Sequence, residues 1–221
     1  MSAKGVLHLT PYFVPHVGGL EKYVYYLTKY TSSEYFHLVL SSRVPEIAPA
    51  VSKEDGVFVE RFPVRLSPFG NPITLGMVRR MLGESRCSLV HVHDEHSFQA
   101  NVGYLAKLLK GKPLILGCYG ELFLEGFLGK LVKAAYESAA VWPMVELADV
   151  VAVLSPLYRE IFAKRYGISR KKMAVLPSAI EPKEYEEKAD FRAVKEKYGI
   201  PDGARLVLYA VSYTHLTLPT T

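Results

Sequence analysis

The densest group of side chains able to do chemistry is the hexapeptide HVHDEH, residues 91–96. Imidazole nitrogens and carboxylate oxygens at this spacing either bind a metal ion or hold the hydroxyl groups of a ligand. Two hypotheses follow: a hydrolytic zinc site, or a hydroxyl-binding site at the end of a strand.

The zinc hypothesis rests on similarity to the H-x-H-x-D-H motif of the metallo-β-lactamase fold, with Glu95 in place of its aspartate. A hydrolytic zinc ion needs about three protein ligands and an open position, and that family takes further histidines from downstream. The next histidine after His96 is His215, close to the end of the chain. A dinuclear site cannot be completed in this way, so we predict no bound metal.

The second hypothesis places these residues around the end of a strand. His91 and His93 are two residues apart and share one face of the strand, where His91 is expected to be packed and hydrogen-bonded. His93, Asp94 and His96 then lie at the carboxyl end, where they can hold ligand hydroxyls. Asp94 has an alternative role as the N-cap of the following helix.

Gly18-Gly19 forms a turn between a strand and a helix. A strand-type run, 6–9, precedes it, and the apolar residues after it fall on one helix face: Leu20, Tyr23, Val24 and Leu27. Glycines before a helix N-terminus let an anion reach the unpaired N–H groups, so we predict that Gly18 and Gly19 face a phosphate. The alternative is a tight turn that needs positive φ. The pair belongs to neither a G-x-G-x-x-G fingerprint nor a P-loop.

Tyr119-Gly120-Glu121 follows another strand-type run, 114–118. Gly120 allows close approach of a ligand, while Tyr119 and Glu121 can bind its hydroxyls. Alternatively, Glu121 belongs to the first turn of a helix, where a carboxylate is favourable. The sequence contains no G-x-S-x-G elbow that would indicate a serine nucleophile.

Short apolar runs alternate with helical patterns along the chain. The strand-type runs span 6–9, 37–41, 57–62, 89–93, 114–118, 149–154, 172–176 and 205–210. Several of them lack polar alternation, as strands of a parallel sheet covered on both faces do. We predict an α/β fold with a doubly wound, Rossmann-like parallel sheet, whose ligands bind beyond the carboxyl ends of the strands.

Three segments carry more specific expectations. Residues 43–56, with two prolines and mixed charge, are expected to form a loop. Residues 122–147 are expected to form a long helix kinked at Pro143. Its apolar side chains belong to the core or, in the alternative, rest on a membrane surface or a lipid acceptor. Ser155-Pro156 is expected to begin a helix that ends at Gly167.

The composition excludes several classes of protein. With 49% hydrophobic and 22% charged residues, the chain resembles a packed globular protein rather than a disordered one. Its net charge of +5 is spread along the sequence, so no nucleic-acid partner is expected. The sequence has two cysteines, no signal-peptide pattern and no apolar run long enough to span a membrane. We therefore expect a cytoplasmic protein, with peripheral contact at the inner face of the membrane as an alternative.

Three stretches together resemble the GT-B glycosyltransferases of family GT4. They are VLHLTPYFVPHVGGLEKYVYYLTKYT, LVHVHD and ADVVAVLSPLYREIFAKRYGISRKKMAVLPSAIEPKEY. Their order and spacing match over nearly all of residues 4–210. The resemblance implies a retaining, hexosyltransferase-like enzyme that needs no cofactor. Such an enzyme moves a sugar from a nucleotide-diphosphate sugar to a saccharide, lipid or small-metabolite acceptor.

The resemblance also assigns roles to residues. In such enzymes two Rossmann-like domains face a cleft, and the N-terminal domain mainly binds the acceptor. By this resemblance Gly18 and Gly19 contact the donor diphosphate. Ser155, Ser178 and Ala179 belong to the interdomain turn. A larger set of residues is expected to line the acceptor side of the cleft: His16, His93, Asp94, His96, Tyr119, Gly120 and Glu121.

The chain departs from the family at three places. Tyr119 stands where many relatives have a histidine near the reacting sugar, and PSAIE, residues 177–181, stands where Asn-Gly is common. The Gly-Arg, Lys and Glu-x7-Glu groups that hold the donor in the family do not occur, so no catalytic residue is assigned. The fragment alone is therefore expected to be inactive.

The expected organisation is an acceptor-side domain over 1–189, a connector over 190–204 and the first strand of a truncated donor-binding domain over 205–210. Residues 211–221 resemble translated sequencing-adapter DNA and are taken as a scar. The alternative function is a non-catalytic α/β domain that binds a nucleotide or phosphate, and the zinc hydrolase comes third.

Overall fold

The computed structural model describes residues 5–120, 122, 126–186, 190–201 and 203–205. The chain divides into two compact units, residues 1–180 and 181–221. The first unit contains a sheet with its covering helices, and the described part of the second contains short helices.

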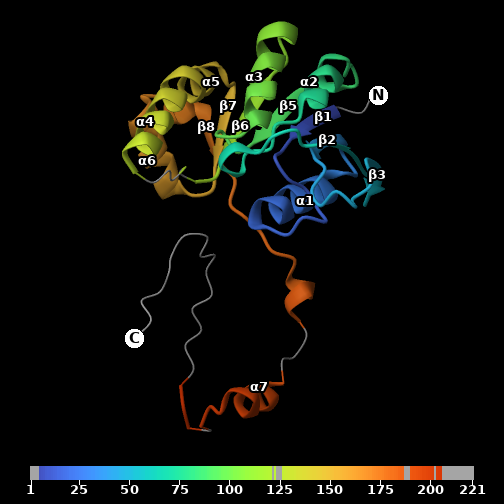
Figure 1. Ribbon diagram of the computed structural model, residues 1–221, viewed down its shortest axis with the longest axis vertical. Helices are drawn as coiled ribbons and strands as arrows, with labels where there is room; N and C mark the ends of the chain where they lie inside the picture. The colour runs from blue at the N-terminus through green and yellow to red at the C-terminus, as the bar shows by residue number, and fades with distance from the viewer. Residues whose placement is uncertain (1–4, 121, 123–125, 187–189, 202, 206–221) are drawn as a thin grey trace. The chain divides into compact units, whose positions relative to one another are not determined.

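The first unit is built on an eight-stranded sheet with the strand order β3-β4-β2-β1-β5-β6-β7-β8 (Figure 1). The strands are β1 (Gly5–Leu9), β2 (Phe36–Ser42), β3 (Val51–Glu54), β4 (Val57–Phe62), β5 (Cys87–His93), β6 (Leu114–Cys118), β7 (Val150–Val153) and β8 (Met173–Val175). Neighbouring strands are parallel except β3 and β4. The predicted α/β fold with a doubly wound parallel sheet is confirmed.

Helices of the first unit connect these strands. They are α1 (Gly19–Thr31), α2 (Leu75–Leu82), α3 (Phe98–Lys110), α4 (Gly126–Tyr136), α5 (Trp142–Leu147) and α6 (Pro156–Tyr166). As expected, Ser155 caps α6, since its Oγ accepts a hydrogen bond from the Tyr158 N–H at 3.1 Å. Gly167 ends the helix with a φ of 67°, which glycine adopts without strain.

The two faces of the sheet carry different side chains. On one face, Leu7 and Leu9 of β1 join a core that includes Met77 of α2. On the other face, Val39 of β2 packs in a smaller cluster with Val24 of α1. Figure 1 shows α1 on the opposite side of the sheet from α2 and α3. Residues that alternate with the leucines of β1 and β2 therefore point towards α1.

The expected loop over 43–56 is wrong in its second half, where β3 pairs antiparallel with β4. The turn between the two strands is Asp55-Gly56, and both residues have positive φ, 47° and 87°. Asp-Gly is a typical two-residue hairpin turn because its residues tolerate this conformation. β3 itself, VSKE, is largely polar and lies at the edge of the sheet, so its sequence gives no strong strand signal.

The expected long helix over 122–147 is interrupted, and its first part is not core. A π-helical turn, Glu137–Val141, separates α4 from α5, and Pro143 stands in the first turn of α5. Proline cannot donate to the preceding turn, which explains the break just before it. Met144 and Val145 of α5 are buried, whereas no residue of α4 is. The core expectation therefore holds for α5 and is wrong for α4.

The described part of the second unit contains a short 3-10 turn, Pro182–Tyr185, and helix α7 (Phe191–Tyr198). The Asp190 carboxylate caps α7 by accepting N–H bonds from Arg192 and Ala193, and Gly199 ends it with a φ of 62°. Apart from Arg205, the expected strand over 205–210 and the expected scar over 211–221 lie outside the described residues. The domain boundaries remain predictions.

Candidate functional site

The order of the strands determines where the site lies. β1 lies between β2 and β5, so the chain leaves β1 towards one side of the sheet and returns at β5 on the other. Ligands of doubly wound sheets bind at such a switch point, beyond the carboxyl ends of the strands. Here the loop after β1 and the turns after β5 and β6 meet at that edge.

A cavity of about 250 Å3 lies at this edge. Its lining combines the first turn of α1 with the turns after β5 and β6: Leu20, Asp94, His96, Tyr119, Gly120 and Leu122. Four of the predicted acceptor-side residues thus share one cavity, and Leu20 directly follows Gly19. No lysine or arginine occurs among the described residues that line it. Glu121, also predicted here, lies outside the residues that the structure describes.

Asp94 occupies a strained turn directly after β5. Its φ of 78° lies in the left-handed region that non-glycine residues seldom adopt. Its Oδ1 accepts a hydrogen bond from the His96 N–H at 3.1 Å, and burial raises its pKa. Ser97 caps α3 instead, because its Oγ accepts the Ala100 N–H at 3.1 Å. The N-cap alternative for Asp94 is therefore wrong.

Glu95 is buried, with 1% of its surface exposed, although its two neighbours line the cavity. Burial raises the pKa of Glu95 well above its usual value, and the nearby charge of Asp94 adds to the effect. Burial also raises the pKa of the Cys118 thiol beside it, well above the usual range. Cys118 therefore stays protonated and is a poor nucleophile.

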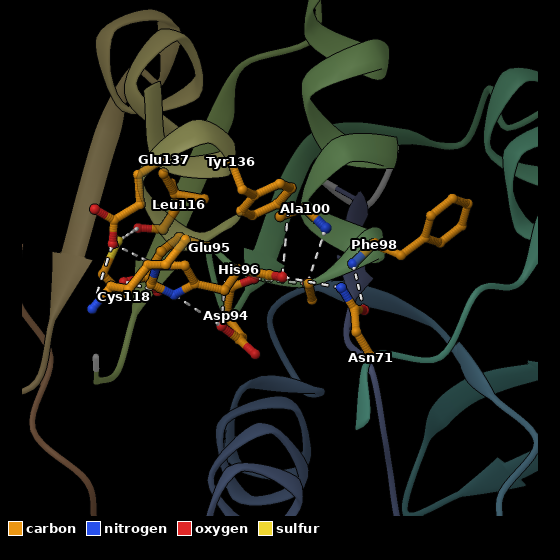
Figure 2. A network of polar contacts seen from close by, with 12 residues as sticks. Asn71, Asp94, Glu95, His96, Phe98, Ala100, Leu116, Cys118, Tyr136 and Glu137 are labelled. Atoms are coloured by element: carbon orange, nitrogen blue, oxygen red, sulfur yellow. Dashed lines mark hydrogen bonds and ion pairs between the residues drawn. The ribbon is translucent and has the colours of Figure 1, made fainter. Parts of the chain in front are cut away.

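Asn71 supports the turn after β5 and was missed by sequence reasoning. Its Nδ2 donates to the His96 carbonyl at 3.1 Å, and its Oδ1 accepts the Phe98 N–H at 2.8 Å (Figure 2). The imidazole of His96 is buried, with Nε2 3.6 Å from Oε1 of Glu137. The sequence places Asn71 in the turn SPFGNP, but nothing in it points to the segment 96–98.

Four buried histidines lie side by side on the α1 face of the sheet: His8, His37, His91 and His93, each at most 4% exposed. Their pKa values are all lowered, first of all by burial. His91 is packed as expected, but its Nε2 has no hydrogen-bond partner among the described residues. His93 does not line the cavity; it lies behind Tyr119, with Nδ1 2.8 Å from the Tyr119 hydroxyl. It therefore reaches the cavity only through Tyr119.

Gly117 is a second residue that sequence reasoning missed. It pairs with His93 across the sheet, and the ring of Tyr119 folds back over it. A Cβ at Gly117 would lie 2.6 Å from Cζ of Tyr119 and would clash with its hydroxyl. The absence of a side chain at Gly117 is thus what admits the tyrosine. A glycine inside an apolar strand is the only signal of such a close approach.

Gly18 and Gly19 stand at the N-terminus of α1, and neither has positive φ. Gly18 is extended, with a φ of −172°, so the alternative of a turn that needs positive φ is wrong. The space beside Gly18 is filled by the carboxylate of Glu21, which is bonded to His16 at 2.8 Å. The space beside Gly19 is open, because a Cβ added there would have no atom of the described residues within 4 Å beyond its chain neighbours and its own helix backbone. An approaching anion would therefore meet Gly19 first.

The remaining predicted residues lie away from this cavity. His16 stacks on the ring of Tyr12 at 4.4 Å and is not among the described lining residues. The Ser155 hydroxyl is occupied as the cap of α6. Ser178 is exposed, and Ala179 lines a second cavity of about 250 Å3 between the segment after β8 and the tyrosines of α1. The interdomain roles of these residues remain predictions.

The histidines of the supposed zinc motif do not converge in the part of the chain that is described. His91 and His93 group with His8 beneath α1, whereas His96 groups with Asp94 and Glu95. The geometry thus divides the motif between two places, each of which brings three possible ligand atoms within 4.8 Å of one another, and the absence of a bound metal stays a prediction.

Comparison with known proteins gives a consistent result. A family model described as Glycosyltransferase Family 4 matches residues 17–184. Sucrose-phosphate synthase from Thermosynechococcus elongatus is 14% identical with a TM-score of 0.63, over 90% of this chain and 53% of that one. Alr3699/HepE from Anabaena, solved with UDP and glucose, is 18% identical with a TM-score of 0.57, over 89% and 50%.

A glycosyltransferase from Rickettsia africae ESF-5 is 15% identical with a TM-score of 0.58, over 92% of this chain and 51% of that one. The chain spans about half the length of these structures, and no curated protein matches it. These structures share its fold, and the family match covers well over half of its residues. The chain belongs to Glycosyltransferase Family 4 and has a Rossmann-like domain of the GT-B fold.

Proposed function

We propose that this chain is the acceptor-binding part of a retaining glycosyltransferase that moves a hexose from a nucleotide-diphosphate sugar to an acceptor hydroxyl. Family membership supports a transferase, and HepE, a structure of the same fold, was solved with UDP and glucose. The observation that carries the proposal is the cavity at the switch point, which joins Asp94 and Tyr119 to the residue after Gly19. The acceptor is a saccharide, a lipid or a small metabolite.

In this proposal the two ends of the site bind different ligands: the N-terminus of α1 binds the diphosphate, and the cavity binds the acceptor. The open side of Gly19 at the N-terminus of α1 takes the diphosphate, because backbone N–H groups and the helix dipole favour an anion there. The acceptor occupies the cavity, whose described lining includes the Asp94 carboxyl but no lysine or arginine. A departing diphosphate needs preorganised positive charge around it, so we propose that this chain alone does not turn over substrate.

A test of the diphosphate end uses UDP and UDP-glucose as probes with the 15N-labelled chain. We expect the amide signals of Gly19 and Leu20 to shift, and Gly19→Val to abolish the shift without unfolding the protein, since space is open there. Val17→Leu, at an 86% exposed position in the same loop, serves as the control that adds bulk elsewhere. Unshifted Gly19 and Leu20 signals at saturating UDP would refute the diphosphate role.

Turnover separates the proposed transferase from the non-catalytic alternative. We expect no UDP release from UDP-glucose by this chain in the presence of glucose, and transfer by the complete reading frame. Turnover by this chain would contradict the proposed inactivity. Binding without transfer by the complete protein would instead favour a non-catalytic nucleotide-binding domain.

We further propose that the protein acts in the cytoplasm and that α4 contacts an anionic membrane surface. None of the described helices is long and apolar enough to cross a bilayer. α4 instead exposes Phe127, Leu128 and Leu131 at 86%, 71% and 57%, with the exposed Lys130 between them. An apolar helix face with lysines favours the interface of an anionic bilayer.

Vesicle sedimentation tests this contact. We expect binding to vesicles that contain phosphatidylglycerol and weaker binding to vesicles of phosphatidylcholine alone. Replacing Leu128 and Leu131 together with serine should weaken binding at least about tenfold, because two exposed leucines no longer enter the bilayer. The matched control replaces Leu108 and Leu109, also exposed, on α3, with serine. An equal loss in both variants would show that α4 is not the contact.

A further inference from the structure

Five side chains form an unbroken line of hydrogen bonds beneath α1, from the end of that helix to the cavity. Oγ1 of Thr31 lies 2.9 Å from Nε2 of His37, and Nδ1 of His37 lies 2.9 Å from Nε2 of His8. Nδ1 of His8 lies 3.0 Å from Nε2 of His93, and Nδ1 of His93 lies 2.8 Å from the Tyr119 hydroxyl. Each imidazole in this histidine line uses both of its nitrogens.

Thr31 sets the direction of the line. Its Oγ1 also lies 2.6 Å from the carbonyl oxygen of Leu27, one turn earlier in α1. A carbonyl oxygen can only accept a hydrogen bond, so the single hydroxyl proton of Thr31 is donated to Leu27. Thr31 therefore accepts from His37, which must carry its proton on Nε2.

Each remaining hydrogen bond of the histidine line likewise needs one donor and one acceptor. Burial lowers the pKa values of His37, His8 and His93, so these rings are neutral and each has one N–H and one bare nitrogen. Each ring then donates through Nε2 and accepts through Nδ1. The last acceptor, Nδ1 of His93, takes the hydroxyl proton of Tyr119. Burial raises the pKa of Tyr119, which keeps that proton in place.

The consequence lies at the cavity. With its proton directed inward to His93, the Tyr119 hydroxyl can only accept further hydrogen bonds, and its acceptor positions are shared between a ligand and the neighbouring Tyr23 hydroxyl. We propose that Tyr119 accepts a hydrogen bond from a hydroxyl of the sugar acceptor, and that His93, His8 and His37 are positioning residues that hold its hydroxyl in this orientation. The proposal rests on the proposed function for the identity of the ligand. It disfavours contact between Tyr119 and the ionised oxygens of a phosphate, which can only accept hydrogen bonds.

The first test reads the ring protons directly. In the full chain labelled with 15N-histidine, long-range 1H–15N correlation at neutral pH should show His8, His37 and His93 protonated on Nε2. Thr31→Val removes the acceptor of His37, and a buried donor without a partner is costly. The three rings should then switch together to protonation on Nδ1, whereas Thr31→Ser should leave them unchanged.

Thr28→Val is the matched control. Thr28 is a fully buried threonine of the same helix whose Oγ1 bonds to the Val24 and Tyr25 carbonyls, with no histidine among its described partners. It should leave all three rings protonated on Nε2. Rings that remain unswitched in Thr31→Val, or that switch in Thr28→Val as well, would overturn the proposed orientation whatever the ligand is.

The second test reads the ligand, with methyl α-D-glucoside and inorganic phosphate as probes. The glucoside should shift the Tyr119 and Gly120 amide signals, and phosphate should not. Thr31→Val should weaken glucoside binding about fivefold to tenfold, the range expected when one hydrogen bond is lost, and Thr31→Ser should restore it. If Thr31→Val and Thr31→Ser bound the glucoside with equal affinity, the role of the histidine line would be overturned. If the ring protons switch as expected but no glucoside binds, the orientation stands and the acceptor role of the cavity, with the proposed function, fails.

Discussion

Lowering the pH from about 6.5 towards 4 is expected to unfold the first unit steeply. Burial lowers the pKa values of His8, His37, His91 and His93, to about 4 in the case of His91. In the unfolded chain these groups bind protons near pH 6.5, the ordinary histidine value, whereas the folded chain excludes them. Because the unfolded state binds more protons, the free energy of unfolding falls as the pH falls.

The size of the effect depends on which groups oppose it. Each histidine contributes a slope of up to about 1.4 kcal/mol per pH unit below its unfolded pKa. Asp94 and Glu95 act in the opposite direction, because burial raises their pKa values and the folded state retains protons that the unfolded state has lost. Burial also lowers the pKa of His96, so five histidines oppose two carboxyls, and the free energy of unfolding falls on acidification between about pH 6.5 and 4.5.

Urea unfolding at a series of pH values measures this slope. His91→Leu should lower it by one histidine's share, because His91 titrates but takes no part in the histidine line. Since Nε2 of His91 has no hydrogen-bond partner in the part of the chain that the structure describes, leucine should also be tolerated at neutral pH. His16→Gln is the control, as its side chain is one-third exposed and lies outside the buried group. A stability that does not change with pH, or a slope that His91→Leu leaves intact, would contradict the explanation.

The sheet was predictable because its strands are short apolar runs separated by helical patterns. The predictions failed for segments in which apolar strand-type runs and helical patterns cannot be told apart from the sequence. β3 is polar and was missed, although Asp55-Gly56 marks its hairpin. The apolar side chains of α4 suggested core because periodicity cannot distinguish a buried face from an exposed one.

The candidate site was predictable as far as the carboxyl ends of strands define it. Asp94, His96, Tyr119 and Gly120 line one cavity because parallel strands end at the same edge. The supporting residues could not be found in this way. Nothing near Gly117 in the sequence says that the ring of Tyr119 turns back over it, and the hydrogen bonds of Asn71 link segments 25 and 27 residues apart.

Replacing Gly117 with alanine is expected to disrupt the site by adding a single methyl group. The new Cβ would lie 2.6 Å from Cζ of Tyr119, so the ring must swing away from His93. His93 is fully buried and would lose its partner at Nδ1, which costs about 1–3 kcal/mol of unfolding free energy. We also expect methyl α-D-glucoside to bind about tenfold more weakly, the effect of about 1.4 kcal/mol.

Two comparisons identify the ring of Tyr119 as the cause. Gly120→Ala adds the same methyl group three residues later, where no atom of the described residues lies within 4 Å beyond the chain neighbours, and should leave the stability unchanged. In a Tyr119→Ala background the ring is gone, so Gly117→Ala should cost little there, and the double-mutant cycle should give a coupling energy close to the whole effect. If Gly117→Ala is equally costly in both backgrounds, the methyl group disturbs β6 itself. The claim that Gly117 admits the Tyr119 ring would then be wrong.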